Sequence, residues 1–205
     1  MKKIAVLASG GGTNFQSVID GCKSGDIEGK VVLLIYNRKE AFAKQRAENE
    51  GIPSVYINRI SEGSVEAMQK RVYDELIKYQ TDIIVLAGYL EKLSLDVVEK
   101  WDNKIINTHP SLIPMFCGKG YFGQNVHRAI IENGVKISGC TIHLVDANYD
   151  TGPIIMQQAV EVQQDDTPES LAKRILPHEH KCLVKSVSLL CQDRISVQNG
   201  RAYII

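Results

Sequence analysis

The apolar residues of the first ninety positions fall into short runs that alternate with stretches of helical character. Four runs have the length and composition of buried strands: residues 3–8, 31–35, 53–57 and 82–87. Three stretches between them are typical of helices: residues 15–22, 40–51 and 65–79. The last stretch follows Ser64, a residue type favoured as a helix N-cap. Strands that alternate with helices predict a parallel sheet covered on both sides.

The second half of the chain has a different pattern. Residues 139–145 alternate between apolar and polar positions, a polar turn follows, and residues 153–162 form another strand-like run. Thr167 and Pro168 begin a final helix, and Asn199-Gly200 predicts the turn of a closing hairpin. The predicted fold class is therefore α/β. We expect one domain, residues 1–205, with a Rossmann-like, mostly parallel sheet, helices on both faces, and antiparallel strands that extend the sheet in the C-terminal half.

Composition narrows the classes of partner. The chain has 205 residues, of which 44% are hydrophobic and 23% charged, as expected for one globular domain. Lys plus Arg and Asp plus Glu are balanced at 24 each, which disfavours a nucleic-acid partner. The five cysteines are odd in number and contain no C-x-x-C pair, so we expect reduced thiols in a cytoplasmic protein. No apolar stretch approaches the roughly 20 residues of a membrane span, so no membrane association is expected.

A glycine turn, SGGGTN at residues 9–14, separates the first predicted strand from the first helix. Backbone N–H groups and the helix dipole favour a phosphate at such a position, although a tight turn that binds nothing is an equally good interpretation. The dinucleotide pattern fails because Phe15 stands where its third glycine belongs, and no Lys-Ser or Lys-Thr follows for a P-loop. A single phosphate, as on a sugar monophosphate, fits what remains.

An amide and an imidazole follow a further apolar run, in the stretch NTHPSLIP at residues 107–114. In an extended strand Asn107 and His109 project to one side and Thr108 to the other. In a parallel sheet this strand end lies at the same edge as the glycine turn, where ligands bind. An amide donor and an imidazole are suited to stabilising an oxyanion and moving a proton while a carbonyl carbon becomes tetrahedral. The alternative is a histidine packed at a strand end with its nitrogens satisfied locally.

An acidic turn, DANYDTG at residues 146–152, resembles the start of a calcium loop. The match then fails, because Thr151 occupies the sixth position, which requires glycine, and Gln157 the twelfth, which requires glutamate. A structural turn is one interpretation. The other is that one of its carboxylates reaches His109 and raises the pKa of the imidazole by favouring the charged form.

These motifs, together with DTGP at residues 150–153, resemble the phosphoribosylglycinamide formyltransferases, or GAR transformylases, of the formyl-folate transferase family. The resemblance extends nearly end to end and includes LAGYL at 86–90, ENG at 132–134 and HEH at 178–180. It implies that the amine of glycinamide ribonucleotide attacks the formyl carbon of 10-formyltetrahydrofolate through a tetrahedral intermediate, in de novo purine biosynthesis. The folate is then a co-substrate, no metal is implied, and the protein is expected as a monomer or homodimer.

The resemblance also assigns roles to residues. Asn107 and His109 would stabilise the oxyanion, and Asp150 would support the charged histidine. Residues 1–100 would form a phosphate- and nucleotide-binding half, and residues 101–205 a catalytic and folate-binding half. The acceptor would be held by Gly12, Thr13 and Asn14 at its phosphate and by Glu179 at its amino end. The folate would be contacted by Leu90, Glu91, Lys92, Leu93, Asn107, Leu144, Val145 and Asp146.

Two departures from the family pattern concern the ligand sites. Val65 stands where many relatives carry a basic residue near the folate tail. Residues 117–123, CGKGYFG, form a longer loop than the short Pro-Gly loop of some relatives. We interpret this loop as a mobile cover with Lys119 as a contact, and an inert surface loop is the alternative.

Three rival functions would each predict different features of the sequence. Methionyl-tRNA formyltransferase uses similar chemistry but adds a C-terminal RNA-binding domain and a basic surface, whereas this chain is neutral and ends at Ile205. Formyltetrahydrofolate hydrolase usually has an additional N-terminal regulatory domain, whereas the catalytic pattern here begins at residue 1. A nucleotide-binding module that has lost turnover would not need Asn107, His109 and Asp150 together.

Overall fold

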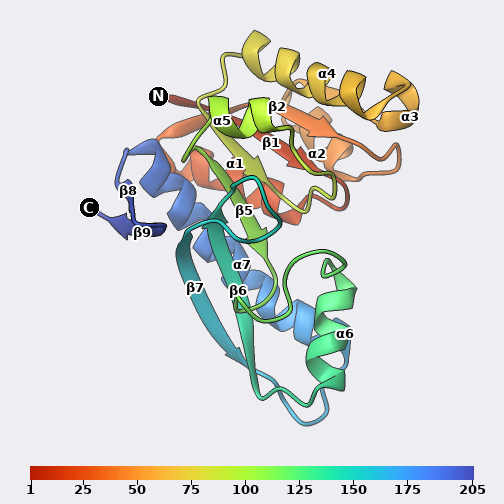
Figure 1. Ribbon diagram of the computed structural model, residues 1–205, viewed down its shortest axis with the longest axis vertical. Helices are drawn as coiled ribbons and strands as arrows, with labels where there is room; N and C mark the ends of the chain where they lie inside the picture. Colours follow the sequence, from red (N-terminus) through yellow and green to blue (C-terminus); the bar gives the residue numbers. More distant parts are fainter.

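The computed structural model describes all residues, 1–205, and is built around a seven-stranded sheet of order β3-β2-β1-β4-β5-β6-β7 (Figure 1). The first five strands in this order are parallel, and β6 and β7 are antiparallel to their neighbours. The sheet strands are β1 (Lys2–Ala8), β2 (Gly29–Tyr36), β3 (Ser54–Tyr56), β4 (Ile83–Leu86), β5 (Ile105–His109), β6 (Ile137–Leu144) and β7 (Ile154–Glu161). The predicted α/β sheet with an antiparallel extension is confirmed.

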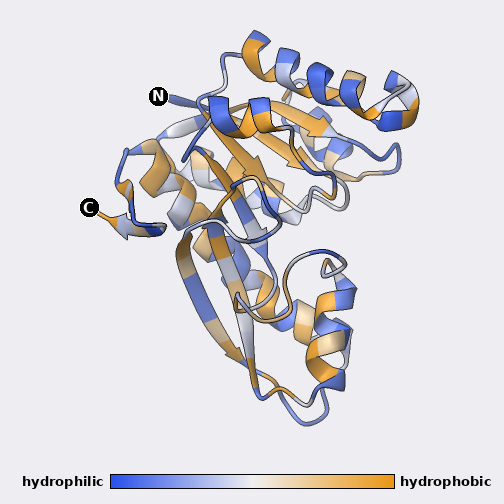
Figure 2. Cartoon of the chain, viewed as in Figure 1, coloured by the Kyte–Doolittle hydropathy of each residue, from blue (hydrophilic) through white to orange (hydrophobic).

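Helices cover both faces of the sheet because successive strand residues point to opposite sides. Ile84 and Ile105 belong to a core of 15 residues under α4 and α5, whereas Val85 and Ile106 belong to a core of 30 residues under α1 and α7. Figure 2 shows the central strands as mainly orange, whereas α4 alternates between orange and blue. The helices are α1 (Thr13–Ser24), α2 (Ala43–Asn49), α3 (Arg59–Glu62), α4 (Val65–Lys78), α5 (Leu95–Lys100), α6 (Gln124–Glu132) and α7 (Pro168–Cys191).

Local capping and turn signals agree with the structure. The Ser64 hydroxyl accepts a hydrogen bond from the N–H of Ala67 at 3.0 Å, which confirms the predicted start of α4. Thr167 caps α7 in the same way. Asn199 and Gly200 have φ angles of 51° and 72°, and they join β8 (Ile195–Gln198) to β9 (Arg201–Ile204) as the predicted hairpin. The short helices α3, α5 and α6 were not predicted. Measured by length and apolar content together, none of the helices qualifies as a membrane span.

The order of the strands reverses between β1 and β4, and this point positions the site. From β1 the chain builds outward to β2 and β3, then returns to place β4 on the other side. Loops that leave β1 and β4 therefore diverge and open a crevice at the carboxyl ends of the strands. Ser9 ties the two loops together, because its N–H donates to the carbonyl of Gly88 at 3.1 Å and its hydroxyl accepts from the N–H of Leu90 at 2.9 Å.

Candidate functional site

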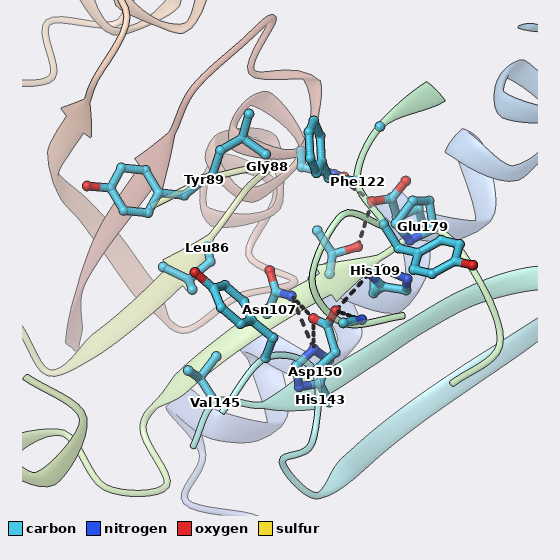
Figure 3. A pocket seen from close by; sticks show the side chains of 18 of the residues that line it. Leu86, Gly88, Tyr89, Asn107, His109, Phe122, His143, Val145, Asp150 and Glu179 are labelled. Carbon is cyan, nitrogen blue, oxygen red and sulfur yellow. Dashed lines mark hydrogen bonds and ion pairs between the residues drawn. The ribbon is translucent and has the colours of Figure 1, made fainter. Parts of the chain in front are cut away.

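A cavity of about 630 Å³ opens at this crevice. Its walls come from the loop after β4, the end of β5, the loop before α6, the loop after β6, and one side of α7. Figure 3 shows Asn107, His109, His143 and Asp150 gathered at its centre, with Glu179 nearby. The predicted ligand edge of the sheet and the observed cavity therefore coincide.

Asn107 is paired with His143 across the antiparallel strands β5 and β6, where the two residues are in register. Nδ1 of His143 lies 2.8 Å from the carbonyl oxygen of Leu144, and because a carbonyl only accepts, the proton is assigned to Nδ1. The free Nε2 then accepts from the Asn107 amide at 3.1 Å. That amide nitrogen also lies 3.4 Å from Asp150 Oδ1, a long hydrogen bond that a substrate oxygen can replace.

His109 is 4% exposed, and both of its ring nitrogens face oxygen atoms. Nε2 lies 2.8 Å from the carbonyl oxygen of Phe116, so in the neutral ring the proton is on Nε2. Nδ1 lies 3.6 Å from Oδ2 of Asp150. In the neutral ring Nδ1 is therefore a proton acceptor beside a carboxylate.

The pKa of His109 lies below its ordinary value of 6.5, mainly because burial disfavours the charged ring. Asp150 and the carbonyl of Phe116 act in the opposite direction, but their combined effect is smaller than that of burial. Asp150 does raise the pKa of His109, as predicted, but the effect of burial is larger. The prediction of a raised pKa is therefore wrong for the ring as a whole. The sequence could not reveal how completely the ring is removed from water.

Asp150 stands between the two histidines. Its Oδ2 accepts from the N–H of Gly118 at 2.8 Å, and its Oδ1 lies 3.6 Å from Nε2 of His143. Burial raises the pKa of the Asp150 carboxyl, but the interactions with His143, Gly118 and His109 together hold it below the ordinary value of 3.8. The group is therefore a carboxylate across the neutral pH range.

The glycine turn joins the same cavity through Asn14 and Glu179. Nδ2 of Asn14 donates to Glu179 Oε1 at 2.9 Å, and the Thr108 hydroxyl donates to the same oxygen at 2.6 Å. Glu179 is 8% exposed, and burial raises the pKa of its carboxyl despite the two hydrogen bonds. Helix α7 thus carries an acid to a point between the start of α1 and the end of β5.

Other predicted ligand residues are divided between the cavity wall and the core. Leu90, Glu91, Lys92, Leu93, Val145 and Asp146 line the cavity. Leu144 does not, because it follows His143 by one position in β6 and points into the core on the opposite face. Gly12 and Thr13 lead into Asn14 without lining the cavity, and Val65 also lies outside its wall.

The turn that resembles a calcium loop is closed by its own hydrogen bonds. Oδ1 of Asp146 accepts from the N–H of Asn148 at 2.9 Å and from the hydroxyl of Thr151 at 2.7 Å. Gly152 packs so tightly that a Cβ there would lie 1.9 Å from the carbonyl oxygen of Leu144. The turn therefore has a structural role that aims Asp150, whose φ of 56° is unusual for a non-glycine residue.

The loop of residues 117–123 forms one wall of the cavity. Gly118, Gly120 and Gly123 all have positive φ angles, between 51° and 93°, which only glycine adopts readily. Gly118 through Gly123 line the cavity, and Lys119 is exposed. Because Gly118 binds Asp150 and the preceding Phe116 binds His109, this wall is connected directly to the central polar groups.

Sequence reasoning missed two histidines of the cavity. His143 could have been found, because it lies on the alternating strand 139–145 and pairs with Asn107 once the two strands are antiparallel. His127 lies on helix α6, which was not predicted although Val126 and Ile130, four positions apart, mark its buried face. It is 5% exposed, and burial lowers the pKa of its ring to about 4, so it is neutral at physiological pH.

Comparison with known proteins places these features in a family. The sequence profile described as "Formyl transferase" matches residues 2–187. Phosphoribosylglycinamide formyltransferase, chloroplastic, of Arabidopsis thaliana is 43% identical over 195 residues, which are 95% of this chain and 67% of the plant protein. The chain spans about two thirds of the length of the chloroplastic relatives that it matches.

Solved structures agree with this assignment. Glycinamide ribonucleotide transformylase 1 from Symbiobacterium toebii superimposes with a TM-score of 0.94 at 36% identity, covering 100% of this chain and 94% of that one. A formyltetrahydrofolate deformylase from Pseudomonas syringae pv. tomato superimposes with a TM-score of 0.89 at 23% identity, covering 100% of this chain and 66% of that one, and it supports the fold alone.

Proposed function

The chain belongs to the formyl transferase family, and on that premise we propose that it transfers the formyl group of 10-formyltetrahydrofolate to the amine of glycinamide ribonucleotide. Relatives that are more than a third identical over nearly all of this chain carry the name of this activity. The acceptor proposed here is therefore the one that those relatives are named for.

One observation carries the proposal: a donor amide, two histidines and a carboxylate meet in the cavity that also receives the glycine turn. Asn107 contacts His143 at 3.1 Å, and His109 lies 3.6 Å from Asp150. Across the cavity Glu179 joins Asn14 to Thr108. A reacting carbonyl group next to the first cluster and the amino end of the acceptor beside Glu179 would together span the cavity, with the acceptor phosphate beyond Asn14 at the glycine turn.

The proposed reaction begins when the acceptor amine attacks the formyl carbon and forms a carbon–nitrogen bond. The carbonyl electrons move to oxygen, and an N–H of Asn107 stabilises the oxyanion. Nδ1 of His109 takes the proton that the attacking nitrogen loses, and Asp150 stabilises the resulting imidazolium. Collapse of the intermediate breaks the bond to the folate nitrogen, which receives the proton from His109. The products are formylated acceptor and tetrahydrofolate.

Binding is assigned to the remaining residues of the two halves. The proposal gives the phosphate to Gly12, Thr13 and Asn14, whose N–H groups have no partner within the chain. Glu179 would accept a hydrogen bond from the amino end of the acceptor. Residues 1–100 supply the phosphate site, and residues 101–205 supply the reacting groups. The folate would lie along Leu90 to Leu93, Asn107, Val145 and Asp146, which line the cavity.

Cellular setting and assembly remain part of the proposal. We assign the protein to the cytoplasm as a monomer or homodimer, with small-molecule substrates, and with neither a metal nor a nucleic acid in the reaction. The five cysteine side chains are free thiols, which supports a reducing compartment. The Arabidopsis relative is described as chloroplastic.

An absorbance assay of the purified protein tests the proposal. Loss of 10-formyltetrahydrofolate is followed with and without glycinamide ribonucleotide. Turnover that requires the ribonucleotide supports a transferase. Equal turnover without it, with release of formate, would instead establish a hydrolase, and tight binding without turnover would establish a binding module.

A further inference from the structure

Arg46, in helix α2, binds the glycine turn on the side that packs against α2. Its Nε donates to the carbonyl oxygen of Gly11 at 2.9 Å, and its Nη1 donates to the side chain of Gln16 at 3.2 Å. The guanidinium carbon also lies 5.2 Å from the centre of the Phe42 ring, within the range of a cation–π contact. Three contacts to three neighbours therefore fix this side chain beside the N-terminus of α1.

The start of α2 supports the turn at two further points. The N–H of Ala43 donates to the carbonyl of Gly10 at 3.2 Å. Gly12 has a φ of 69°, and a Cβ there would lie 2.8 Å from the Cβ of Ala43. Two successive carbonyls of the turn, those of Gly10 and Gly11, are thus bound to α2, and the third glycine packs on it.

The backbone carbonyl groups of Gly10 and Gly11 are bound within the chain, whereas the backbone N–H groups that follow them are not. A carbonyl oxygen at a helix N-terminus would repel a phosphate, but the carbonyl of Gly11 is satisfied by a cation. The N–H groups of Gly12, Thr13 and Asn14 donate no hydrogen bond within the chain. No side chain caps α1 either, so the donors are left for an external anion.

We propose that Arg46 is a positioning residue for the acceptor phosphate, because it holds the glycine turn with its carbonyls bound to α2 and its N–H groups free. The inference rests on the proposed function, since it concerns the same phosphate. Nothing in the motif SGGGTN points to a residue 35 positions after Gly11, and only the packing of α2 reveals the contact.

Lysine cannot reproduce this role. The guanidinium is a planar fork that donates to Gly11 and Gln16 at once while it stacks on Phe42, whereas an ammonium has no planar face and cannot make all three contacts. We therefore expect Arg46→Lys and Arg46→Ala to raise the KM of the acceptor about 10-fold or more, which is the effect of losing a charge-assisted hydrogen bond. The kcat and the KM of the folate should stay within about twofold of the parent, because Arg46 touches neither the cavity nor the reacting groups.

The decisive comparison uses an acceptor without its phosphate. Steady-state kinetics are measured with glycinamide ribonucleotide and with the dephosphorylated glycinamide riboside, for the parent, Arg46→Lys, Arg46→Ala and Lys44→Ala. Lys44→Ala is the matched control, since Lys44 is exposed on the same helix and pairs only with Glu48 at 3.5 Å. The loss in the Arg46 variants should appear with the ribonucleotide and vanish with the riboside. Equal losses with both acceptors would show a merely structural role and overturn the proposal.

A titration with inorganic phosphate separates this proposal from the proposed function. Amide resonances of residues 10–14 are followed by NMR, and phosphate affinity should fall about 10-fold in both Arg46 variants and stay unchanged in Lys44→Ala. That result upholds the role of Arg46 even if no formyl transfer is found. Unchanged phosphate affinity in Arg46→Ala, or no phosphate binding by the parent protein, would overturn it.

Discussion

The two ends of the cavity are built in different ways. At the glycine turn the proposed ligand groups are backbone N–H donors, held by packing of Gly12 on Ala43 and by the hydrogen bond from Arg46. At the strand ends they are side chains, and the pKa values of His109 and Asp150 depend on one another. The first end has a fixed geometry and a fixed charge. The second end changes its charge as protons move.

Substitutions at the two ends should therefore change different kinetic constants. A backbone donor interacts with the phosphate equally in the ground state and the transition state, so it should affect the KM of the acceptor. A proton acceptor or oxyanion donor acts mainly in the transition state, so it should affect kcat. Glu179 connects the ends, because it binds both Asn14 and Thr108.

The largest effects are expected at the reaction end. Asn107→Ala and His109→Ala should each lower kcat about 100- to 1000-fold, because each removes a group that acts on the tetrahedral intermediate. The KM of the acceptor should change by less than about threefold. Steady-state kinetics check both values, with His178→Ala as a control histidine that does not line the cavity. Full turnover in His109→Ala would refute the mechanism.

A smaller loss, with a change in pH dependence, is expected for Asp150→Asn. Neutral His109 accepts the proton, so activity of the parent should fall only as the pH drops through the His109 pKa, which lies below 6.5. Removal of the carboxylate removes an influence that raises this pKa, so the acidic limb of the kcat/KM profile should move to lower pH. The rate at neutral pH should fall about 10- to 100-fold, because the imidazolium loses its partner. An acidic limb that moves to higher pH would contradict this account.

At the phosphate end, Gly12→Ala should raise the KM of the acceptor about 10-fold and leave kcat within about threefold. The positive φ costs about 1–2 kcal/mol for alanine, and the new Cβ meets Ala43, so the melting temperature should fall as well. Gly11→Ala is the matched comparison, since a Cβ there meets nothing within 4 Å. Equal effects of the two substitutions on KM would show that the backbone shape of the turn does not matter.

The smallest effect is expected for Lys119→Ala. Lys119 lines the cavity in the loop before α6, but its side chain is exposed to solvent, and an exposed charge contributes little to binding. Both kcat and each KM should change by less than about threefold. A loss above 10-fold would instead establish the loop as a cover that contacts the substrate through this lysine.

The sequence predicted the features that depend on short-range order. Runs such as residues 3–8 and the cap at Ser64 identify strands and helices locally. Parallel strands align their carboxyl ends, so the sequence predicted that the glycine turn and the end of β5 lie at one edge of the sheet. The period of two along a strand was enough to predict that Asn107 and His109 project to the same side.

Features that depend on distant packing were not predicted. Arg46 reaches Gly11 only because α2 packs on the turn. Helix α6 is different, because its buried Val126 and Ile130 lie four positions apart, which is a local helix signal that was missed. The net shift of the His109 pKa depends on how fully the ring is buried in the folded protein. Leu144 was assigned to the folate by the resemblance, but its side chain points into the core, as the period of two along residues 139–145 indicates.

Transfer of the formyl group from folate to the acceptor amine is the central claim, and a labelled formyl group tests it most directly. The protein is incubated with glycinamide ribonucleotide and 10-formyltetrahydrofolate carrying carbon-13 in the formyl group, and the products of a single turnover are identified by NMR. We predict that the label appears as an amide on the ribonucleotide, in an amount equal to the tetrahydrofolate formed. Label that appears as formate, at the same rate with and without the ribonucleotide, would contradict the claim.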